Sequence, residues 1–224
     1  MTQTVEQLLR DDVRPPIVYL RSFNEEEQES KYGRSLRRTF FGRLVGGSGS
    51  AAYLEEQKEF GVYMRWVGPY IAITRPGEKS VSGAVRLEVS DRHWKSVVKK
   101  LLKKAGFVVV RLGGTPGLTW EIKEVIRMIR PTVILLITPG NKQEYKMLCQ
   151  HMTSFFPHGL PTRMPNSRLL TFDERWHATP LKPRANLIES LAPFFRWNGV
   201  DFPVNSVEAF IRQKKRGYVI KPPG

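Results

Sequence analysis

The stretch Trp94–Ile129, WKSVVKKLLKKAGFVVVRLGGTPGLTWEIKEVIRMI, decides the predicted fold. Its first part predicts an amphipathic helix, because its apolar residues recur at the spacing of one helix face. They are Trp94, Val97, Val98, Leu101, Leu102 and Ala105. Asp91 can cap the start of this helix, and Gly106 ends it. The apolar run Phe107–Leu112 then predicts a strand buried on both faces, as in parallel sheets.

The second part of the stretch predicts a turn and another helix. Gly113–Gly117 cannot continue a strand, and apolar residues from Leu118 onward again follow a helical period until Pro131. Glu121 is expected in the first turn of this helix, beside the apolar stripe and not on it. Open α/β sheets bind their ligands where a strand's carboxyl end meets such a turn. Glu121 is therefore the first candidate for a functional residue.

Strands and helices alternate along the rest of the chain, which predicts an α/β fold: a flavodoxin-like three-layer arrangement around a central parallel sheet. The predicted strands are Ile17–Phe23, Tyr70–Thr74, Phe107–Leu112, Thr132–Ile137 and a fifth at Arg168–Phe172. Residues 1–14 are expected to be a polar lead-in, and 15–200 the domain, with a mobile loop at 24–50. Residues 201–224 are expected to form a C-terminal helix and a basic tail.

Composition narrows the class of protein. The 224 residues are 41% hydrophobic, which is enough to bury a core. The single cysteine, Cys149, excludes an internal disulfide, and the four histidines show no metal-ligand spacing, so no metal site is predicted. The beginning of the chain has no secretory pattern, and the longest apolar run is too short to cross a bilayer. A soluble cytoplasmic protein without membrane contact is expected.

The chain is strongly basic, with a formal net charge of +15. Such a charge attracts nucleic acid without sequence preference. The basic residues are spread over several clusters, however, and no nucleic-acid-binding motif accompanies them. One cluster is the polar face of the helix that begins at Trp94, where lysines are expected to be exposed. Nucleic acid is therefore a possible but disfavoured partner.

The order of elements and the residues at their edges resemble the TIR (Toll/interleukin-1 receptor) domain, and in particular bacterial TIR-like proteins with an LRSF first strand. Four segments carry this resemblance. They are Ile17–Asn24 as the opening strand, Ile73–Glu78 as the loop after the second strand, Trp94–Leu112 as the following helix and strand, and Trp120–Ile122 at the glutamate position. The likeness covers about residues 15–140 well and 165–200 loosely.

The resemblance implies cleavage of the nicotinamide–ribose bond of NAD+, or cyclisation of the product, in bacterial defence or signalling. NAD+ is then a substrate and no cofactor is required. A preorganised carboxylate would stabilise the cationic ribose of the transition state, as in glycosidases. Glu121 takes this role, and the substrate-binding candidates are Arg21, Ser22, Phe23, Arg75, Gly77 and Trp120. TIR-like sites are often completed by a neighbouring subunit, which implies a homo-oligomer.

Each of these residues also has a structural reading. An early helical glutamate can simply favour the helix dipole, and Trp120 can be a packing residue. Arg21 can pair with the acidic run at 25–27 instead of a ligand. Two other functions are therefore kept beside the NAD+ glycohydrolase: a non-enzymatic TIR-like adaptor that self-associates, and a basic nucleic-acid-associated protein.

Overall fold

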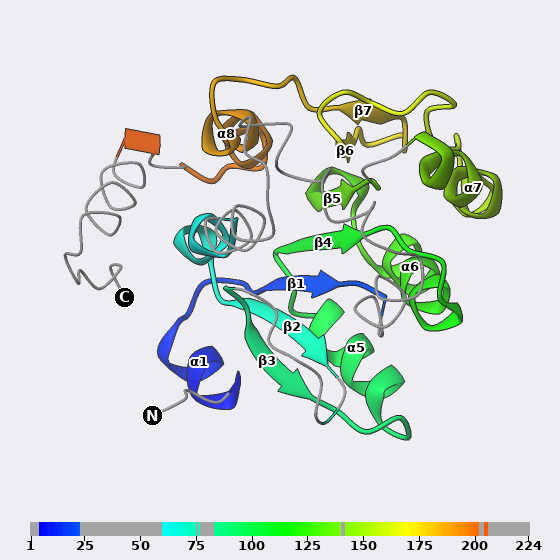
Figure 1. Cartoon of the computed structure of the whole chain (residues 1–224). Coiled ribbons are helices and arrows are strands. Elements are labelled where there is room, and N and C mark those ends of the chain that lie inside the picture. The colour runs from blue at the N-terminus through cyan, green and yellow to red at the C-terminus, as the bar shows by residue number, and fades with distance from the viewer. Residues whose placement is uncertain are drawn as a thin grey trace, which may run out of the picture.

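The computed structural model describes residues 5–22, 60–74, 76, 83–139, 142–201 and 204–205. It contains a seven-stranded sheet in the order β3-β2-β1-β4-β5-β6-β7 (Figure 1). The strands are β1 (Ile17–Leu20), β2 (Tyr70–Thr74), β3 (Val85–Glu88), β4 (Phe107–Arg111), β5 (Ile134–Ile137), β6 (Leu169–Phe172) and β7 (Ala178–Pro180). The predicted α/β three-layer fold class is confirmed.

The first five strands are parallel, and the last two are antiparallel to their neighbours. The four strands predicted first all lie in the parallel part, as neighbours in the order β2-β1-β4-β5. The prediction missed β3, where half-buried and exposed residues alternate at the edge of the sheet. It was also wrong in extending the parallel pattern to β6, which returns beside β5 with opposite direction and forms a hairpin with β7.

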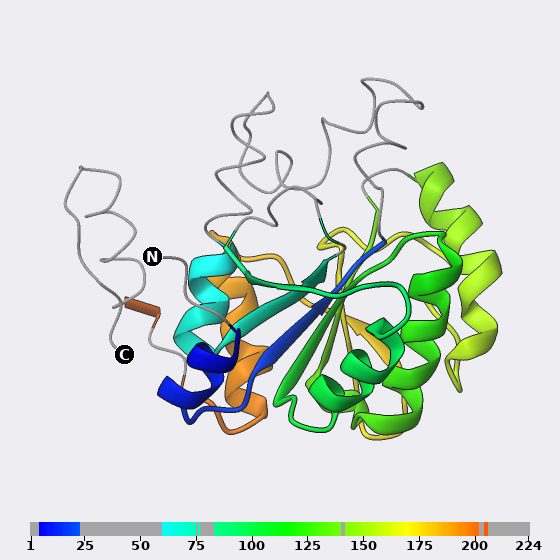
Figure 2. The same ribbon diagram turned by 90° about the horizontal axis from the view of Figure 1, so that it is seen from below.

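Helices cover both faces of this sheet (Figures 1 and 2). On one face lie α5 (Trp94–Leu102), α6 (Pro116–Met128) and α7 (Lys142–Met152), which is extended by a 3₁₀ turn at Thr153–Phe155. On the other face lie the helical residues 60–67 and α8 (Leu187–Trp197). Successive strand residues alternate between these two cores: Val18 and Leu20 face α5 and α6, whereas Ile17 and Tyr19 face α8.

The helix boundaries correct two details of the prediction. Asp91 does not cap α5, because the N-cap residue is His93 and makes no side-chain capping bond. The α6 helix begins at Pro116, earlier than expected, and its N-cap Thr115 accepts a hydrogen bond from the Leu118 amide. Proline suits the first helical position because its missing N–H has no helical partner there.

The segment expected to be a polar lead-in forms a helix, α1 (Val5–Asp11), whose Val5 is buried in the same core as α5 and α6. The loop expected at 24–50 and most of the tail expected at 201–224 lie outside the described residues. Among the residues that are described, no helix is long and apolar enough to cross a membrane.

The amino edge of the sheet is closed by tight backbone packing around Pro15. A Cβ atom on Gly68 would lie 2.5 Å from the Pro15 carbonyl oxygen, and one on Gly106 would lie 2.7 Å from the Pro15 Cβ. The amide of Gly106 also donates to the Pro16 carbonyl at 2.9 Å. Only glycine lets these chain segments approach so closely.

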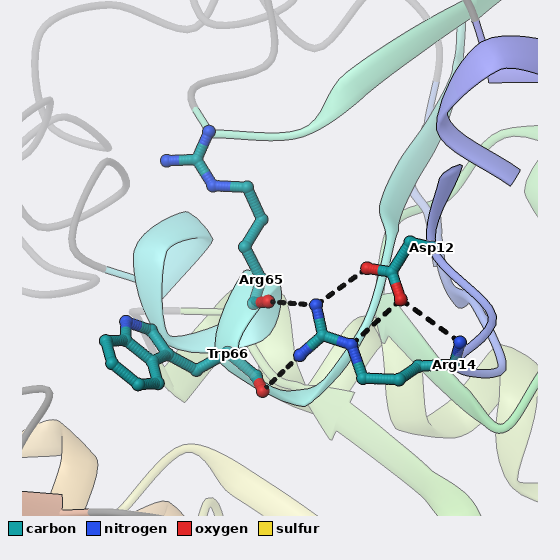
Figure 3. Close-up of polar contacts among 4 residues, drawn as sticks. All are labelled: Asp12, Arg14, Arg65 and Trp66. Carbon is teal, nitrogen blue, oxygen red and sulfur yellow. Dashed lines mark hydrogen bonds and ion pairs between the residues drawn. The ribbon is translucent and has the colours of Figure 1, made fainter. Parts of the chain in front are cut away.

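Arg14 joins this edge to the helix at 60–67 (Figure 3). Its guanidinium donates to both carboxylate oxygens of Asp12, at 2.9 and 2.6 Å. It also donates to the carbonyl of Trp66 at 2.7 Å and to that of Arg65 at 3.3 Å. Arg14 thus satisfies carbonyls in the last turn of that helix, where a cation is also favoured by the helix dipole.

Candidate functional site

The carboxyl edge of the sheet has a topological switch point between β1 and β4. The chain leaves β1 toward β2 on one side, and it leaves β4 toward β5 on the other. The residues after these two neighbouring strands meet there. Their contact is a hydrogen bond of 3.2 Å, which the Thr115 hydroxyl donates to the Ser22 hydroxyl. Ligands of open α/β sheets bind at such a point. Figure 2 shows β1 and β4 leading to this edge.

Buried polar side chains concentrate at the same edge. Ser22 follows β1, Thr74 ends β2, Thr138 follows β5, and Ser167 and Arg168 precede β6, which starts at this edge because it is antiparallel to β5. The described residues include only two more buried polar side chains, Glu121 and Ser190. Burying a polar group is costly unless it is satisfied. The apolar core therefore turns polar where a ligand would bind.

Glu121 lies in the second turn of α6, and its side chain is only 1% exposed. This corrects two expectations: it is not in the first turn, and it is buried with Leu118, Ile122 and Val125 on the core side of the helix. Neither of its carboxylate oxygens has a hydrogen-bond partner within the described residues. Interaction with the helix dipole is therefore a poor explanation for a glutamate at position 121, because the effect of the dipole falls off beyond the first turn.

Burial raises the pKa of the Glu121 carboxyl to about 8. The cause is desolvation, which disfavours the charged form of an acid. Near neutral pH the group is therefore mainly protonated in the free protein. A carboxyl of this kind is sensitive to its surroundings, since a cation brought close to it favours the ionised form.

Neighbouring contacts orient α6, and helix geometry then gives the side on which Glu121 lies. Trp120 packs edge-to-face on Trp94 of α5, with ring centroids 4.8 Å apart, and Glu124 lies 3.9 Å from Lys99 of α5. This side of α6 therefore faces α5. Glu121 is about 100° further around the helix from Trp120, toward the sheet. Helical side chains tilt toward the helix N-terminus, which places the carboxyl on the carboxyl-edge side of its own Cα.

The structure does not bring Arg21 and Glu121 to the same face of the sheet. Arg21 continues the alternation of β1 on the side of Tyr19. It acts electrostatically on Tyr70, which lies in the core covered by the helical residues 60–67 and α8. Burial and Tyr19 raise the pKa of the Tyr70 phenol well above its ordinary value, and the Arg21 guanidinium acts in the opposite direction. Ser22, in contrast, points to the α6 side, as its bond to Thr115 shows.

The other sequence-predicted residues divide into two groups. Phe23, Arg75 and Gly77 lie outside the described residues, and between the last two Pro76 is exposed. Trp120 is half-buried and packs against Trp94. This contact fits the alternative that Trp120 is a packing residue, which was considered beside a substrate-binding role. The ammonium groups of Lys95 and Lys99 lie 5.3 and 5.7 Å from the centre of the Trp120 ring.

Sequence reasoning missed Thr138 and Arg168. The Thr138 amide and hydroxyl both donate to the Arg168 carbonyl, at 2.8 and 3.2 Å, and the Arg168 guanidinium donates to the Thr138 carbonyl at 3.3 Å. Arg168 is 4% exposed and has a φ of 59°, which is unusual for a residue other than glycine. Arg168 was predicted as the first residue of the strand Arg168–Phe172, which begins one residue later, at Leu169. Its sequence gave no sign of burial, because an arginine at the end of a strand is ordinarily a surface residue.

A second polar cluster lies away from this edge, on the β6–β7 hairpin. His177 Nδ1 lies 2.9 Å from an Asp173 carboxylate oxygen, and the His177 ring stacks on His158 with centroids 4.2 Å apart. All three side chains are at least partly exposed. Across the described ranges, no group of three or more His, Cys, Asp or Glu residues is arranged to hold a metal ion.

Comparisons with protein-family models, with curated proteins and with solved structures found no match to this chain. The candidate site therefore rests on its own geometry. Its parts are a buried carboxyl on α6, a pair of bonded hydroxyls at the switch point, and a buried arginine at the same edge of the sheet.

Proposed function

We propose that this protein is a TIR-like NAD+ glycohydrolase, with Glu121 as its catalytic carboxylate. The single observation that carries the proposal is the state of that side chain. It is almost fully buried in the second turn of α6, the helix that begins at the switch point, and neither oxygen has a hydrogen-bond partner among the described residues. A buried acid without a partner costs stability, and perturbed acids of this kind concentrate at functional sites.

The reaction breaks the bond between the ribose C1′ and the nicotinamide nitrogen. Nicotinamide leaves with the bonding electrons and becomes neutral, so the positive charge moves to the ribose. Water then bonds to C1′ and releases a proton, which gives ADP-ribose. Attack on C1′ by an atom of the adenine instead of water would give the cyclic product. An ionised carboxylate held close to the ribose stabilises its positive charge in the transition state.

The protonation state of Glu121 fits a cationic substrate. In the free protein the carboxyl is mainly protonated near neutral pH, because its pKa is about 8. The positive nicotinamide ring would favour the ionised form as it approaches. Substrate binding should then release a proton, and the carboxylate would be charged only when it has a cation to stabilise.

The neighbouring groups suit the rest of a dinucleotide. The hydroxyls of Ser22 and Thr115 can exchange hydrogen bonds with ribose hydroxyls at the switch point. Arg168 is a cation at the same edge, and arginine binds phosphate oxygens in pairs. Arg21, Phe23, Arg75, Gly77 and Trp120 stay predictions from the resemblance. So do a role in bacterial defence or signalling and a homo-oligomer that completes the site. A cytoplasmic location stays a prediction from composition.

The test is release of free nicotinamide from NAD+ by concentrated wild-type protein. Glu121→Gln keeps the shape of the side chain and removes its charge, so the rate should fall by about 10²-fold or more. Glu124→Gln is the matched control on the same helix, since Glu124 pairs with Arg127 at 2.6 Å and is not fully buried. That variant should keep nearly the wild-type rate. For the wild type, kcat/KM should rise with pH until about pH 8, as Glu121 ionises.

Absence of nicotinamide release at high protein concentration would contradict the enzyme and favour the self-associating adaptor. Equal activity of the Glu121→Gln variant and the wild type would contradict the role of Glu121 alone.

A further inference from the structure

The solvent face of α5 carries an unusual run of positive charge. From residue 92 to 104 the sequence RHWKSVVKKLLKK contains six Lys or Arg residues and no Asp or Glu. Five of them are lysines on α5 or immediately after it, and all five are exposed. They are Lys95, Lys99, Lys100, Lys103 and Lys104. The expectation that this lysine face is exposed is therefore confirmed.

This arrangement works against the helix that carries it. Lys95 and Lys99, Lys99 and Lys103, and Lys100 and Lys104 are like-charged pairs four residues apart, which destabilise a helix. Opposite charge does little to offset them. Among the described residues, the five lysines make one ion pair, Lys99 with Glu124 at 3.9 Å, and Glu124 is shared with Arg127. The helix dipole favours Lys99 and Lys100 in the last turn of α5, but few acidic neighbours balance the face as a whole. A surface with one sign of charge attracts a partner of opposite charge.

Two of the lysines have their ammonium groups over aromatic rings. The Lys95 ammonium lies 5.8 Å from the centre of the Trp94 ring and 5.3 Å from that of Trp120, and Lys99 lies 5.7 Å from that of Trp120. These rings come from the neighbouring helices α5 and α6, which lie side by side in Figures 1 and 2. Side chains that are positioned before binding lose less conformational entropy when a partner binds.

We propose that this lysine face binds the phosphate backbone of nucleic acid, independently of the site at Glu121. Phosphate contacts need little beyond positive charge, and they bind without regard to sequence. A protein partner would need a buried apolar or aromatic anchor, yet the exposed residues of α5 are lysines and Ser96. A membrane-surface helix would need a free apolar face, whereas Val98, Leu101 and Leu102 are buried in the core.

The experiment measures binding of the full chain to a fluorescent oligonucleotide of about 20 nucleotides, as a single strand and as a duplex, over a series of salt concentrations. The test variant replaces Lys100, Lys103 and Lys104 with glutamine. The control replaces Lys142, Lys146 and Lys182, which are exposed elsewhere on the chain, in the same way. Both variants lose the same charge, so only the position of the loss differs.

We expect the α5 variant to bind on the order of tenfold more weakly, with a smaller slope of log affinity against log salt by about 2 to 3 for the duplex. The control should change binding much less, and both variants should unfold near the wild-type temperature. Equal losses in the two variants would overturn the proposal, because net charge alone would then explain binding. The proposal would also be overturned if the wild type bound the oligonucleotide no more tightly than it binds anionic lipid vesicles or an acidic peptide.

Discussion

The two edges of the central sheet differ in what fills them. At the amino edge, Gly68 and Gly106 bring the backbone against Pro15, and Arg14 fastens the chain to helical carbonyls. At the carboxyl edge, polar side chains are buried instead. Thr74 ends β2 at this edge, and Glu121 lies in the second turn of the helix that begins there. Both have buried oxygen atoms that make no hydrogen bond within the described residues.

The two edges are therefore expected to affect the stability of the folded state in opposite directions. Close backbone packing with satisfied hydrogen bonds lowers the energy of the folded state. Buried polar groups without partners raise it, and proteins keep such groups mainly where a ligand supplies the missing interactions. Substitutions at the amino edge should therefore lower stability, whereas removal of the Glu121 charge should raise it in the pH range where that charge is present.

The largest effect is expected from Glu121→Gln in the free energy of unfolding at high pH. Because the folded pKa is about 8 and the unfolded pKa is ordinary, the folded protein holds one extra proton between these values. Wild-type stability should therefore fall as the pH rises from about 4.5 to about 8, by an amount on the order of 5 kcal/mol. The variant should lack this loss, so its advantage should be absent near pH 5 and greatest near pH 9.

Urea unfolding of both proteins at the two pH values measures this difference, and Glu124→Gln serves as the control that should not change the slope with pH. A Glu121→Gln variant that is less stable than the wild type near pH 9 would show that the carboxylate has a stabilising partner.

Gly68→Ala should produce the next largest effect, at the amino edge. The new methyl group would lie 2.5 Å from the Pro15 carbonyl oxygen, so the backbone has to shift. We expect a loss of about 2–3 kcal/mol in the free energy of unfolding, with little dependence on pH. The matched control is Gly114→Ala at the carboxyl edge, where the nearest atom to the new methyl is Leu148 Cδ2 at 3.8 Å.

Gly114→Ala should change the free energy of unfolding by less than about 1 kcal/mol, because ordinary contact is compatible with a methyl group. Similar losses in the two variants would remove the contrast between a tightly packed amino edge and a more open carboxyl edge.

Arg14→Met should produce the smallest effect, about 1 kcal/mol, because Arg14 is partly exposed and its bonds are screened by water. Its hydrogen bonds lower the pKa of the Asp12 carboxyl. The interaction is therefore complete above the ordinary aspartate pKa of about 3.9, and it is lost as the pH falls below that value. Thermal unfolding near neutral and acid pH measures it. Arg10→Met, on the exposed side of α1, is the control and should be neutral.

Much of the fold could be predicted from local patterns. Tyr70–Thr74 was predicted with its observed bounds, and the strands beginning at Ile17 and Phe107 end only one to three residues earlier than predicted. These strands are continuous apolar runs, and the apolar residues of α5 and α6 recur with a helical period. Each segment can therefore be predicted from its own sequence. The strand β3 lacks both signals, because it alternates at the edge of the sheet and becomes a strand only by pairing with β2.

The sequence by itself determined the parallel core, the exposed lysine face of α5 and the placement of Glu121 on the helix that follows a buried strand and a glycine-rich turn. Only the tertiary structure decided that Glu121 is buried, that Arg21 faces the other side of the sheet and that Thr138 and Arg168 join the polar edge. The reason is that helical and strand periods are local. The solvation of one carboxyl at the margin of an apolar stripe depends instead on which distant segments close over it.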